Sequence, residues 1–308
     1  MNKYLIVIVG PTAIGKTALS ISLANHFQTE ILSTDSRQIF KEMTIGTAVP
    51  NKKELNSAIH HFIQNKSIFD KYSVGDYELE SIELLRKLYK KHKVVIAVGG
   101  SGLYVNALLN GLDDFPDIKP GIREEIIKNY ESLGLTYLQD TLQKYDSNYF
   151  KIIAENNPQT LQNPQRLMRF IEVCISSNQP YSSFINKEKN QRDFTPIIIG
   201  LQANRDILYN RINQRVDLMM NEGLLEEAKI LYPHKTLNAL QTVGYKELFT
   251  YFNHELTLDD SIEKIKQNTR NFAKRQITWF NKTENVKWFD YQEDIEAILN
   301  HIHDKINA

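Results

Sequence analysis

The residues of this sequence that could most readily do chemistry lie in one short stretch near its N-terminus. Residues 10–17, GPTAIGKT, match the phosphate-binding pattern G-x-x-x-x-G-K-[ST] in full. In such a loop, glycines let successive backbone N–H groups point at one anion, and the following helix adds its positive N-terminal end. Lys16 would supply a mobile charge for the terminal phosphate, and the Thr17 hydroxyl suits a Mg²⁺ ion that bridges phosphate oxygens. The pattern predicts a phosphate site made by Gly10, Pro11, Thr12, Ala13, Ile14, Gly15, Lys16 and Thr17.

A carboxylate is the second reactive group, and the sequence offers one candidate near this loop. In motor-type ATPases, an acid at the end of a second buried strand holds Mg²⁺ and polarises water. Here the apolar run 94–98 leads into residues 99–102 (GGSG), without an acid, whereas the run 31–33 leads to Asp35. We therefore expect Asp35 to be the only acid near the loop at the carboxyl edge of the sheet, where ligands of such folds bind. Its carboxylate could serve as a base, but it could also cap a helix or bind Mg²⁺.

Alternating strands and helices must position these groups. Four short apolar runs are typical of strands buried in a parallel sheet: residues 4–9, 31–33, 94–98 and 197–201. Four longer stretches have apolar positions at helical spacing: residues 16–27, 78–91, 205–231 and 259–281. We expect the last of these to be the final helix of the chain. The pattern predicts an α/β fold, a P-loop NTPase-like parallel sheet flanked by helices.

The predicted sheet is interrupted by a stretch of different character. From about residue 115 to residue 190 the chain is almost entirely helical pattern and polar loop, punctuated by prolines. We interpret residues 1–114 and 191–308 as a catalytic core, and residues 115–190 as a mostly helical insertion domain. A length of 308 residues is enough for one large domain or two modest ones.

Composition and charge limit the possible partners. The chain is 42% apolar and 24% charged, as in ordinary soluble enzymes, and its formal net charge is zero. A nucleic acid would therefore have to be held by a local basic patch. Cys174 is the only cysteine, which excludes an intramolecular disulfide and a cysteine-based zinc site, and its apolar neighbours predict a buried, inert thiol. No stretch approaches a transmembrane length, so we expect a cytoplasmic protein without membrane association, and a monomer.

Eight blocks of sequence carry a resemblance to a known family. They occur in the family's order: GPTAIGKT (10–17), STDSRQIF (33–40), IGTA (45–48), HHF (60–62), GGSGLY (99–104), NPQRLMR (163–169), VGYKE (243–247) and TRNFAKRQITWF (269–280). On these blocks the chain resembles the bacterial tRNA dimethylallyltransferases, and also the adenylate isopentenyltransferases that make cytokinins. The first resemblance implies transfer of a dimethylallyl group from dimethylallyl diphosphate, with release of diphosphate. The acceptor would be the exocyclic amine of the adenosine 3′-adjacent to the anticodon, in tRNAs that read codons beginning with U.

The resemblance also implies roles for single residues. Asp35 matches the family's catalytic aspartate, which would accept a proton from the weakly nucleophilic amine. Lys16, Thr17 and Mg²⁺ would stabilise the charge that develops on the diphosphate, and Arg215 matches an arginine that reaches it. Ser101 stands where the family usually has threonine, so a hydroxyl is kept while a methyl contact is lost.

Further residues match family segments that contact tRNA. They are Asp35, Ser36, Arg37, Gln38, Ser101, Arg123, Gln165, Arg166, Leu167, Met168, Arg169, Gln241, Thr242, Val243, Gly244, Tyr245 and Lys246. Without the resemblance, Arg166 and Arg169 would be interpreted as part of a solvated helix face.

The predicted final helix combines cations with aromatic side chains. Arg270, Lys274 and Arg275 could bind RNA, cover the phosphate site or pair with acids, and the sequence leaves these roles open. We expect Trp279 and Phe280 to anchor the core instead.

Three other functions remain possible from the residues. An isopentenyltransferase for free AMP, ADP or ATP would use the same donor, although the insertion and the tRNA-type segments argue against it. A small-molecule kinase would consume the γ-phosphate of ATP, whereas the main hypothesis needs no nucleoside triphosphate. An RNA-binding module without catalysis would not need a carboxylate aimed at a base.

Overall fold

The computed structural model describes residues 2–185 and 191–307. The chain divides into two compact units, the first made of Met1–Asn110 with Gln191–Ala308 and the second of Gly111–Asn190. The predicted insertion, residues 115–190, falls within the second unit. No helix of residues 2–185 or 191–307 has both the length and the apolar character needed to cross a lipid bilayer.

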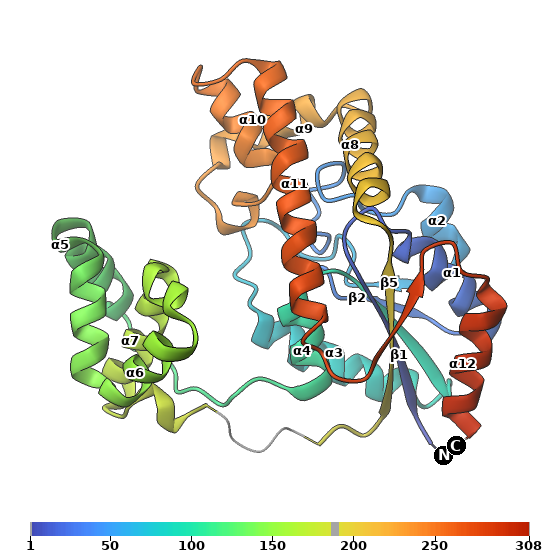
Figure 1. Cartoon of the computed structure of the whole chain (residues 1–308), viewed down its shortest axis with the longest axis horizontal. Coiled ribbons are helices and arrows are strands. Elements are labelled where there is room, and N and C mark those ends of the chain that lie inside the picture. Colours follow the sequence, from blue (N-terminus) through green and yellow to red (C-terminus); the bar gives the residue numbers. More distant parts are fainter. Residues whose placement is uncertain (1, 186–190, 308) are drawn as a thin grey trace. The chain divides into compact units, whose positions relative to one another are not determined.

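A six-stranded parallel sheet forms the centre of the first unit (Figure 1). The strands are β1 (Tyr4–Val9), β2 (Ile31–Ser33), β3 (His60–His61), β4 (Val94–Val98), β5 (Thr195–Gln202) and β6 (Val286–Asp290). Their order in the sheet is β3-β2-β4-β1-β5-β6, so β1 lies between β4 and β5. The predicted parallel α/β sheet is confirmed.

Helices cover both faces of this sheet, which explains why β1 is apolar along its whole length. Leu5 and Val7 of β1 belong to one core cluster, which also takes apolar residues from the helices that follow β3 and β4. Ile6 and Ile8 belong to a second cluster on the other face, with residues of the first and last helices. Because successive side chains of a strand alternate between faces, both halves of the run are buried.

The helices of the first unit, within the described residues, are as follows. They are α1 (Lys16–Phe27), α2 (Lys52–Ser57), α3 (Val74–Leu88), α4 (Gly102–Asn110), α8 (Arg205–Asn221), α9 (Leu224–Leu231), α10 (Tyr245–Phe252), α11 (Leu258–Phe280) and α12 (Ile295–Asn307). Figure 1 shows α1 and α12 on one side of the sheet and α3 with α4 on the other.

Two expectations about these helices are wrong. The helix at 259–281 is not the last, because β6 and α12 follow it. Ile298 and Ile302 of α12 repeat at helical spacing and are buried against the sheet, a signal that we overlooked. The stretch 205–231 is two helices, because Gly223 adopts a left-handed φ of 101° between α8 and α9.

The second unit is a small helical bundle. It contains α5 (Ile122–Tyr145), α6 (Ser147–Asn156) and α7 (Pro164–Ser177), with short 3₁₀ turns at Pro158–Gln162 and Tyr181–Ser183. Its core is built from leucines, isoleucines and aromatic side chains of these helices. Cys174 on α7 is buried, which confirms the predicted burial of the thiol, and burial raises its pKa to about 11.

Candidate active site

The phosphate loop joins β1 to α1, as the sequence predicts. Gly10 has a φ of 142°, and a Cβ atom there would lie 2.6 Å from the carbonyl oxygen of Leu201 on β5. Gly15 has a φ of 113° and forms the N-cap of α1. Both positions need glycine, since left-handed backbone strains other residues. The Lys16 ammonium folds back over this loop and donates to the carbonyl oxygens of Gly10 (3.0 Å) and Pro11 (2.7 Å).

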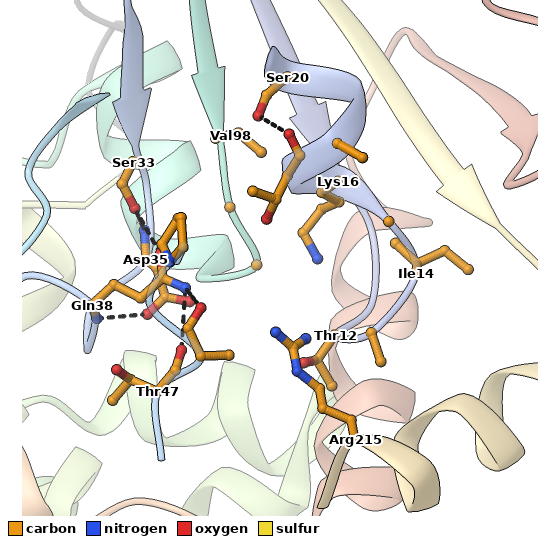
Figure 2. A pocket seen from close by; sticks show the side chains of 18 of the residues that line it. Thr12, Ile14, Lys16, Ser20, Ser33, Asp35, Gln38, Thr47, Val98 and Arg215 are labelled. Atoms are coloured by element: carbon orange, nitrogen blue, oxygen red, sulfur yellow. Dashed lines mark hydrogen bonds between the residues drawn. The ribbon is translucent and has the colours of Figure 1, made fainter. Parts of the chain in front are cut away.

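Two cations face the same cavity from different helices. Figure 2 shows the side chains of Lys16 from α1 and Arg215 from α8 pointing toward one another. Burial, reinforced by the Arg215 charge and opposed by Asp35, lowers the pKa of Lys16 to about 7. Burial also lowers the pKa of Arg215, again opposed by Asp35. Both shifts indicate buried positive charge that a bound anion would stabilise.

Two cavities, each of about 440 Å³, meet at these residues. The first, here called the phosphate-loop cavity, is lined by the phosphate loop together with Gln38 and Arg211. The second, here called the apolar cavity, is lined by Leu103, Met219, Trp279 and other mostly apolar side chains. The residues that line both are Thr12, Asp35, Thr47, Ala48, Gly100, Arg215, Phe272 and Gln276. Asp35 and Arg215 therefore stand where the two cavities adjoin.

The two oxygens of the Asp35 carboxylate have different surroundings. Oδ1 accepts the backbone N–H groups of Arg37 (2.8 Å) and Gln38 (3.2 Å), so it holds the turn that follows β2. Oδ2 accepts no hydrogen bond from residues 2–185 or 191–307. The helix-capping role that the sequence left open is not confirmed, because residues 36–39 form a turn and not a helix. One oxygen instead holds this turn, and the other remains available to a ligand.

Ser101 braces the same turn from the start of α4. Its Oγ accepts the backbone N–H of Ser36 (3.0 Å) and donates to the Ser36 Oγ (3.2 Å). Both residues line the apolar cavity, as does Arg37, whose pKa is lowered by burial. The structure thus brings Ser101 against the predicted segment of Asp35, Ser36 and Arg37, from which it is 65 residues distant along the chain.

Three residues at the site were missed. Gln276 of α11 accepts the backbone N–H of Thr12 through Oε1 (2.8 Å) and donates through Nε2 to the Gly100 carbonyl (2.9 Å). Arg211 Nε donates to the Ala13 carbonyl (2.8 Å), one helical turn before Arg215. Glu54 also lines the phosphate-loop cavity, so the expectation that Asp35 would be the only acid near the loop is wrong. Gln276 lies inside a sequence block quoted above, but Glu54 carries no local signal because α2 reaches the site only through folding.

Of the α11 cations Arg270, Lys274 and Arg275, two contact α8 and the third lines a cavity. Arg270 Nη1 donates to Asn213 Oδ1 of α8 (2.6 Å), and Lys274 lies 5.9 Å from the ring centroid of Tyr209, so both support α8. Arg275 lines the apolar cavity.

The two aromatic residues that end α11 also differ. Phe280 is fully buried, as expected. Trp279 is not a core anchor: it is 44% exposed and lines the apolar cavity, where its ring packs on Gly102. Gly102 leaves space for the ring, so the tryptophan stays at the cavity wall.

In the second unit, arginines gather around one buried acid. Arg123 pairs with Glu172 (2.6 Å) and donates to Gln165 Oε1 (2.7 Å), and Arg169 Nη1 lies 3.9 Å from the same carboxylate. Arg166 donates to the hydroxyl of Thr160 (3.3 Å). The structure therefore brings Arg123 and Arg169 together at Glu172, whereas Arg166 lies one helical turn before Arg169 and contacts Thr160. These three arginines are here called the basic cluster.

Not every predicted tRNA contact has an accessible side chain. Leu167 and Met168 are buried in the core of the second unit, and Tyr245 is buried in the first. These three side chains pack against their neighbours because they lie on the apolar faces of helices. The prediction that they contact tRNA through their side chains is therefore wrong for all three. In the segment 241–246, Thr242, Val243 and Gly244 line the apolar cavity, and Gln241 Nε2 donates to the Lys235 carbonyl (2.5 Å), while Lys246 is exposed.

Known proteins of one family match this chain over most of its length. The family model described as IPP transferase matches residues 38–283. A protein of Flavobacterium johnsoniae named tRNA dimethylallyltransferase is 63% identical over 306 residues, 99% of each chain. The solved tRNA isopentenylpyrophosphate transferase of Bacillus halodurans is 35% identical, with a TM-score of 0.71 over 99% of this chain and 96% of that one. A eukaryotic dimethylallyltransferase acting on tRNA has a TM-score of 0.79 at 27% identity, over 95% of this chain and 75% of that one.

Proposed function

This chain belongs to the IPP transferase family, and we propose that its two cavities bring dimethylallyl diphosphate and a tRNA adenosine to the same carboxylate. Its relatives are named for transfer of dimethylallyl or isopentenyl groups to tRNA, and they match it over nearly its whole length. The chain is a transferase that modifies tRNA. These relatives support neither the free-nucleotide enzyme nor the small-molecule kinase.

The observation that carries the proposal is that Asp35 and Arg215 line both cavities. The donor's diphosphate lies in the phosphate-loop cavity, against the loop's N–H groups, Lys16 and Arg215. The adenine enters through the apolar cavity, whose lining suits a purine ring and an isoprenoid chain and keeps water from the reactive carbon.

The bond changes then follow from the positions of the groups. The allylic C–O bond breaks and its electron pair leaves with the diphosphate, while the adenine amine forms the new C–N bond. The amine proton passes to Asp35, whose Oδ2 is free of hydrogen bonds from the described residues. Lys16 and Arg215 stabilise the diphosphate more as its charge grows, which lowers the barrier.

The Thr17 hydroxyl and the donor's own phosphate oxygens fit a Mg²⁺ ion. Among the described residues, no group of three or more acidic, histidine or cysteine side chains is arranged to hold a metal. Mg²⁺ suits such a place, because it commonly keeps several waters and takes one or two protein ligands beside substrate phosphates. When bound, it would neutralise part of the charge on the leaving diphosphate.

The acceptor is proposed to be the adenosine 3′-adjacent to the anticodon, in tRNAs that read codons beginning with U. That base must leave its stack to reach Asp35, which costs a few kcal/mol, and phosphate contacts from the basic cluster of the second unit would hold the stem in register. A cytoplasmic location and a monomeric state remain predictions of the sequence.

Incubation with radiolabelled dimethylallyl diphosphate, Mg²⁺ and either bulk tRNA or AMP tests this function. We expect label on tRNA, and nucleoside mass analysis should place it on the adenosine 3′ of the anticodon. Label on AMP with none on tRNA would overturn the assignment in favour of a free-nucleotide enzyme.

A further inference from the structure

A carboxylate outside both cavities holds the loop that forms their common wall. Glu227 of α9 accepts three consecutive backbone N–H groups of that loop: Thr44 (3.0 Å) and Ile45 (2.8 Å) through Oε2, and Gly46 (2.9 Å) through Oε1. Successive N–H groups that converge on one anion form a tight, charge-assisted contact. The residues that follow, Thr47 and Ala48, line both cavities.

Tyr245 of α10 completes the anchor. Its hydroxyl donates to Glu227 Oε1 (2.6 Å), and a Cβ atom on Gly46 would lie 2.6 Å from the tyrosine ring. Burial and the neighbouring carboxylate raise the pKa of the Tyr245 phenol, so it stays a proton donor to Glu227. The loop is therefore held by hydrogen bonds to the Glu227 carboxylate and by packing of Gly46 against the Tyr245 ring.

The anchored loop is tied in turn to the catalytic carboxylate. Gln38 Nε2 donates to the carbonyl oxygens of Thr47 (3.1 Å) and Ala48 (2.8 Å). The backbone N–H of Gln38 donates to Asp35 Oδ1. A continuous path of hydrogen bonds thus runs from α9 and α10 through the loop 44–48 and Gln38 to Asp35, and Figure 2 shows its last part, with Gln38 between Thr47 and Asp35.

We propose that Glu227, which accepts a hydrogen bond from Tyr245, is a positioning residue. It fixes the loop 44–48 and, through Gln38, the orientation of Asp35 toward the acceptor amine. The inference rests on the proposed function, because it concerns the base of that reaction. Glu227 itself lines neither cavity, so its effect passes through the loop. Tyr245 directly follows Thr242, Val243 and Gly244, which line the apolar cavity, so the same segment contributes to the cavity wall and to this path.

Replacement of Glu227 by Gln tests the proposal, because the amide keeps the shape but offers the loop one acceptor oxygen in place of two. We expect kcat for transfer to tRNA to fall by about 10- to 100-fold, since a misplacement of about 1 Å at a catalytic group costs that much. KM for tRNA and for dimethylallyl diphosphate should change by less than about threefold, because their binding groups remain. Glu226→Gln, an exposed neighbour on the same helix, is the matched control and should keep wild-type kinetics.

Amide hydrogen exchange separates the anchor from the activity. In wild-type protein and in Glu226→Gln, the amides of residues 44–46 should be protected, and in Glu227→Gln they should exchange at least about tenfold faster while the β1 amides do not change. Unchanged protection of residues 44–46 would overturn the anchor even if the wild-type enzyme proved not to modify tRNA, so the two hypotheses can fail separately.

A double-mutant cycle tests the path to Asp35. Gln38→Ala and Glu227→Gln should each lower kcat, and the double variant should be little worse than the more damaged single variant, because both changes break one path. Additive losses in kcat would overturn the proposed route. A kcat for Glu227→Gln equal to the wild-type value, or a loss explained entirely by a reduced fraction of folded protein in thermal unfolding, would overturn the positioning role.

Discussion

At the scale of single residues, the site is defined by two buried cations, Lys16 and Arg215, neither of which forms an ion pair with residues 2–185 or 191–307. Lys16 and Arg215 face one cavity, and the Lys16 ammonium donates hydrogen bonds to two carbonyl oxygens of its own loop. The cost of burying this charge appears as the lowered pKa of Lys16. An entering diphosphate would replace the carbonyl contacts and favour the charged form of the lysine.

Proton uptake on ligand binding follows from this pKa. A lysine whose folded pKa is about 7, below its ordinary value of 10.5, is mostly neutral above that pH in the free protein. Diphosphate should raise that pKa, so at about pH 8 binding should take up a proton and affinity should weaken as the pH rises further. Titration calorimetry in two buffers of different ionisation enthalpy measures the uptake, and Lys16→Met should take up less. Equal uptake by both proteins would contradict the lowered pKa.

The same shift affects stability, in a defined direction. Between about pH 7 and pH 10.5 the unfolded chain binds more protons at Lys16 than the folded chain, so this group makes the free energy of unfolding rise with pH across that window. The contribution belongs to the ligand-free protein and should vanish in Lys16→Met.

The divided surroundings of Asp35 determine how it should be tested. Asp35→Asn keeps Oδ1 as an acceptor for the turn but removes the base, so the site should stay folded while kcat falls by about 10² to 10⁴. Binding of tRNA, measured by filter retention, should remain near the wild-type value. Asp35→Ala should abolish transfer as well, but it also frees two backbone N–H groups. Wild-type turnover in the asparagine variant would remove Asp35 from the role of base.

At the scale of elements, side chains of α11 link the separate loops and helices that form the site. The Gln276 side chain joins the phosphate loop after β1 to the loop after β4, and Arg270 and Lys274 support α8, which carries Arg215. The two loops emerge from neighbouring parallel strands, whose carboxyl ends share one edge of the sheet. Helix α11 therefore sets the relative position of the groups that surround the diphosphate.

Loss of the two hydrogen bonds of Gln276 should weaken donor binding. Gln276→Leu leaves the Thr12 N–H and the Gly100 carbonyl without their partner, at a cost of about 1–3 kcal/mol each. We expect KM for dimethylallyl diphosphate to rise and the melting temperature to fall, as measured by steady-state kinetics and calorimetry. Gln267→Leu, an exposed position on the same helix, is the control. A Gln276→Leu enzyme with unchanged donor KM would show that the bridge is dispensable.

At the scale of the whole molecule, the reaction chemistry and the arginine cluster belong to different units. The cavities lie within the first unit. Arg123 and Arg169, which face Glu172, and Arg166, which donates to Thr160, lie within the second. Under the proposed function, this division would separate the binding of a large RNA from the chemistry on one of its bases.

This division predicts which constants the arginines control. Paired Arg166→Ala and Arg169→Ala should weaken tRNA binding and reduce the slope of log affinity against log salt by about one to two units, because phosphate contacts release counterions. Affinity for the donor should not change. Paired Lys128→Ala and Lys144→Ala, which removes the same charge from the second unit, is the comparison. An unaltered salt slope in the arginine variant would return these residues to a solvated helix face.

Local sequence was sufficient for the phosphate loop, for Asp35 at the end of β2, and for the buried strands of a parallel sheet. Each of these depends on neighbours within a few residues, where glycine, β-branched and charged side chains have direct conformational consequences. The end of α11 shows the limit of such reasoning: Phe280 is buried as expected, whereas Trp279 is half exposed at a cavity wall.

The tertiary structure alone decided which distant groups meet. Thr12 and Gln276 are 264 residues apart in the chain, and Gly46 and Glu227 are 181 apart, yet each pair shares a hydrogen bond. No spacing rule in one sequence encodes such a pair, because the partners become neighbours only when the sheet order and the helix packing bring their elements together. The arrangement of Asp35 and Arg215 between two cavities arises in the same way, because the loop after β2 and helix α8 line the same two cavities.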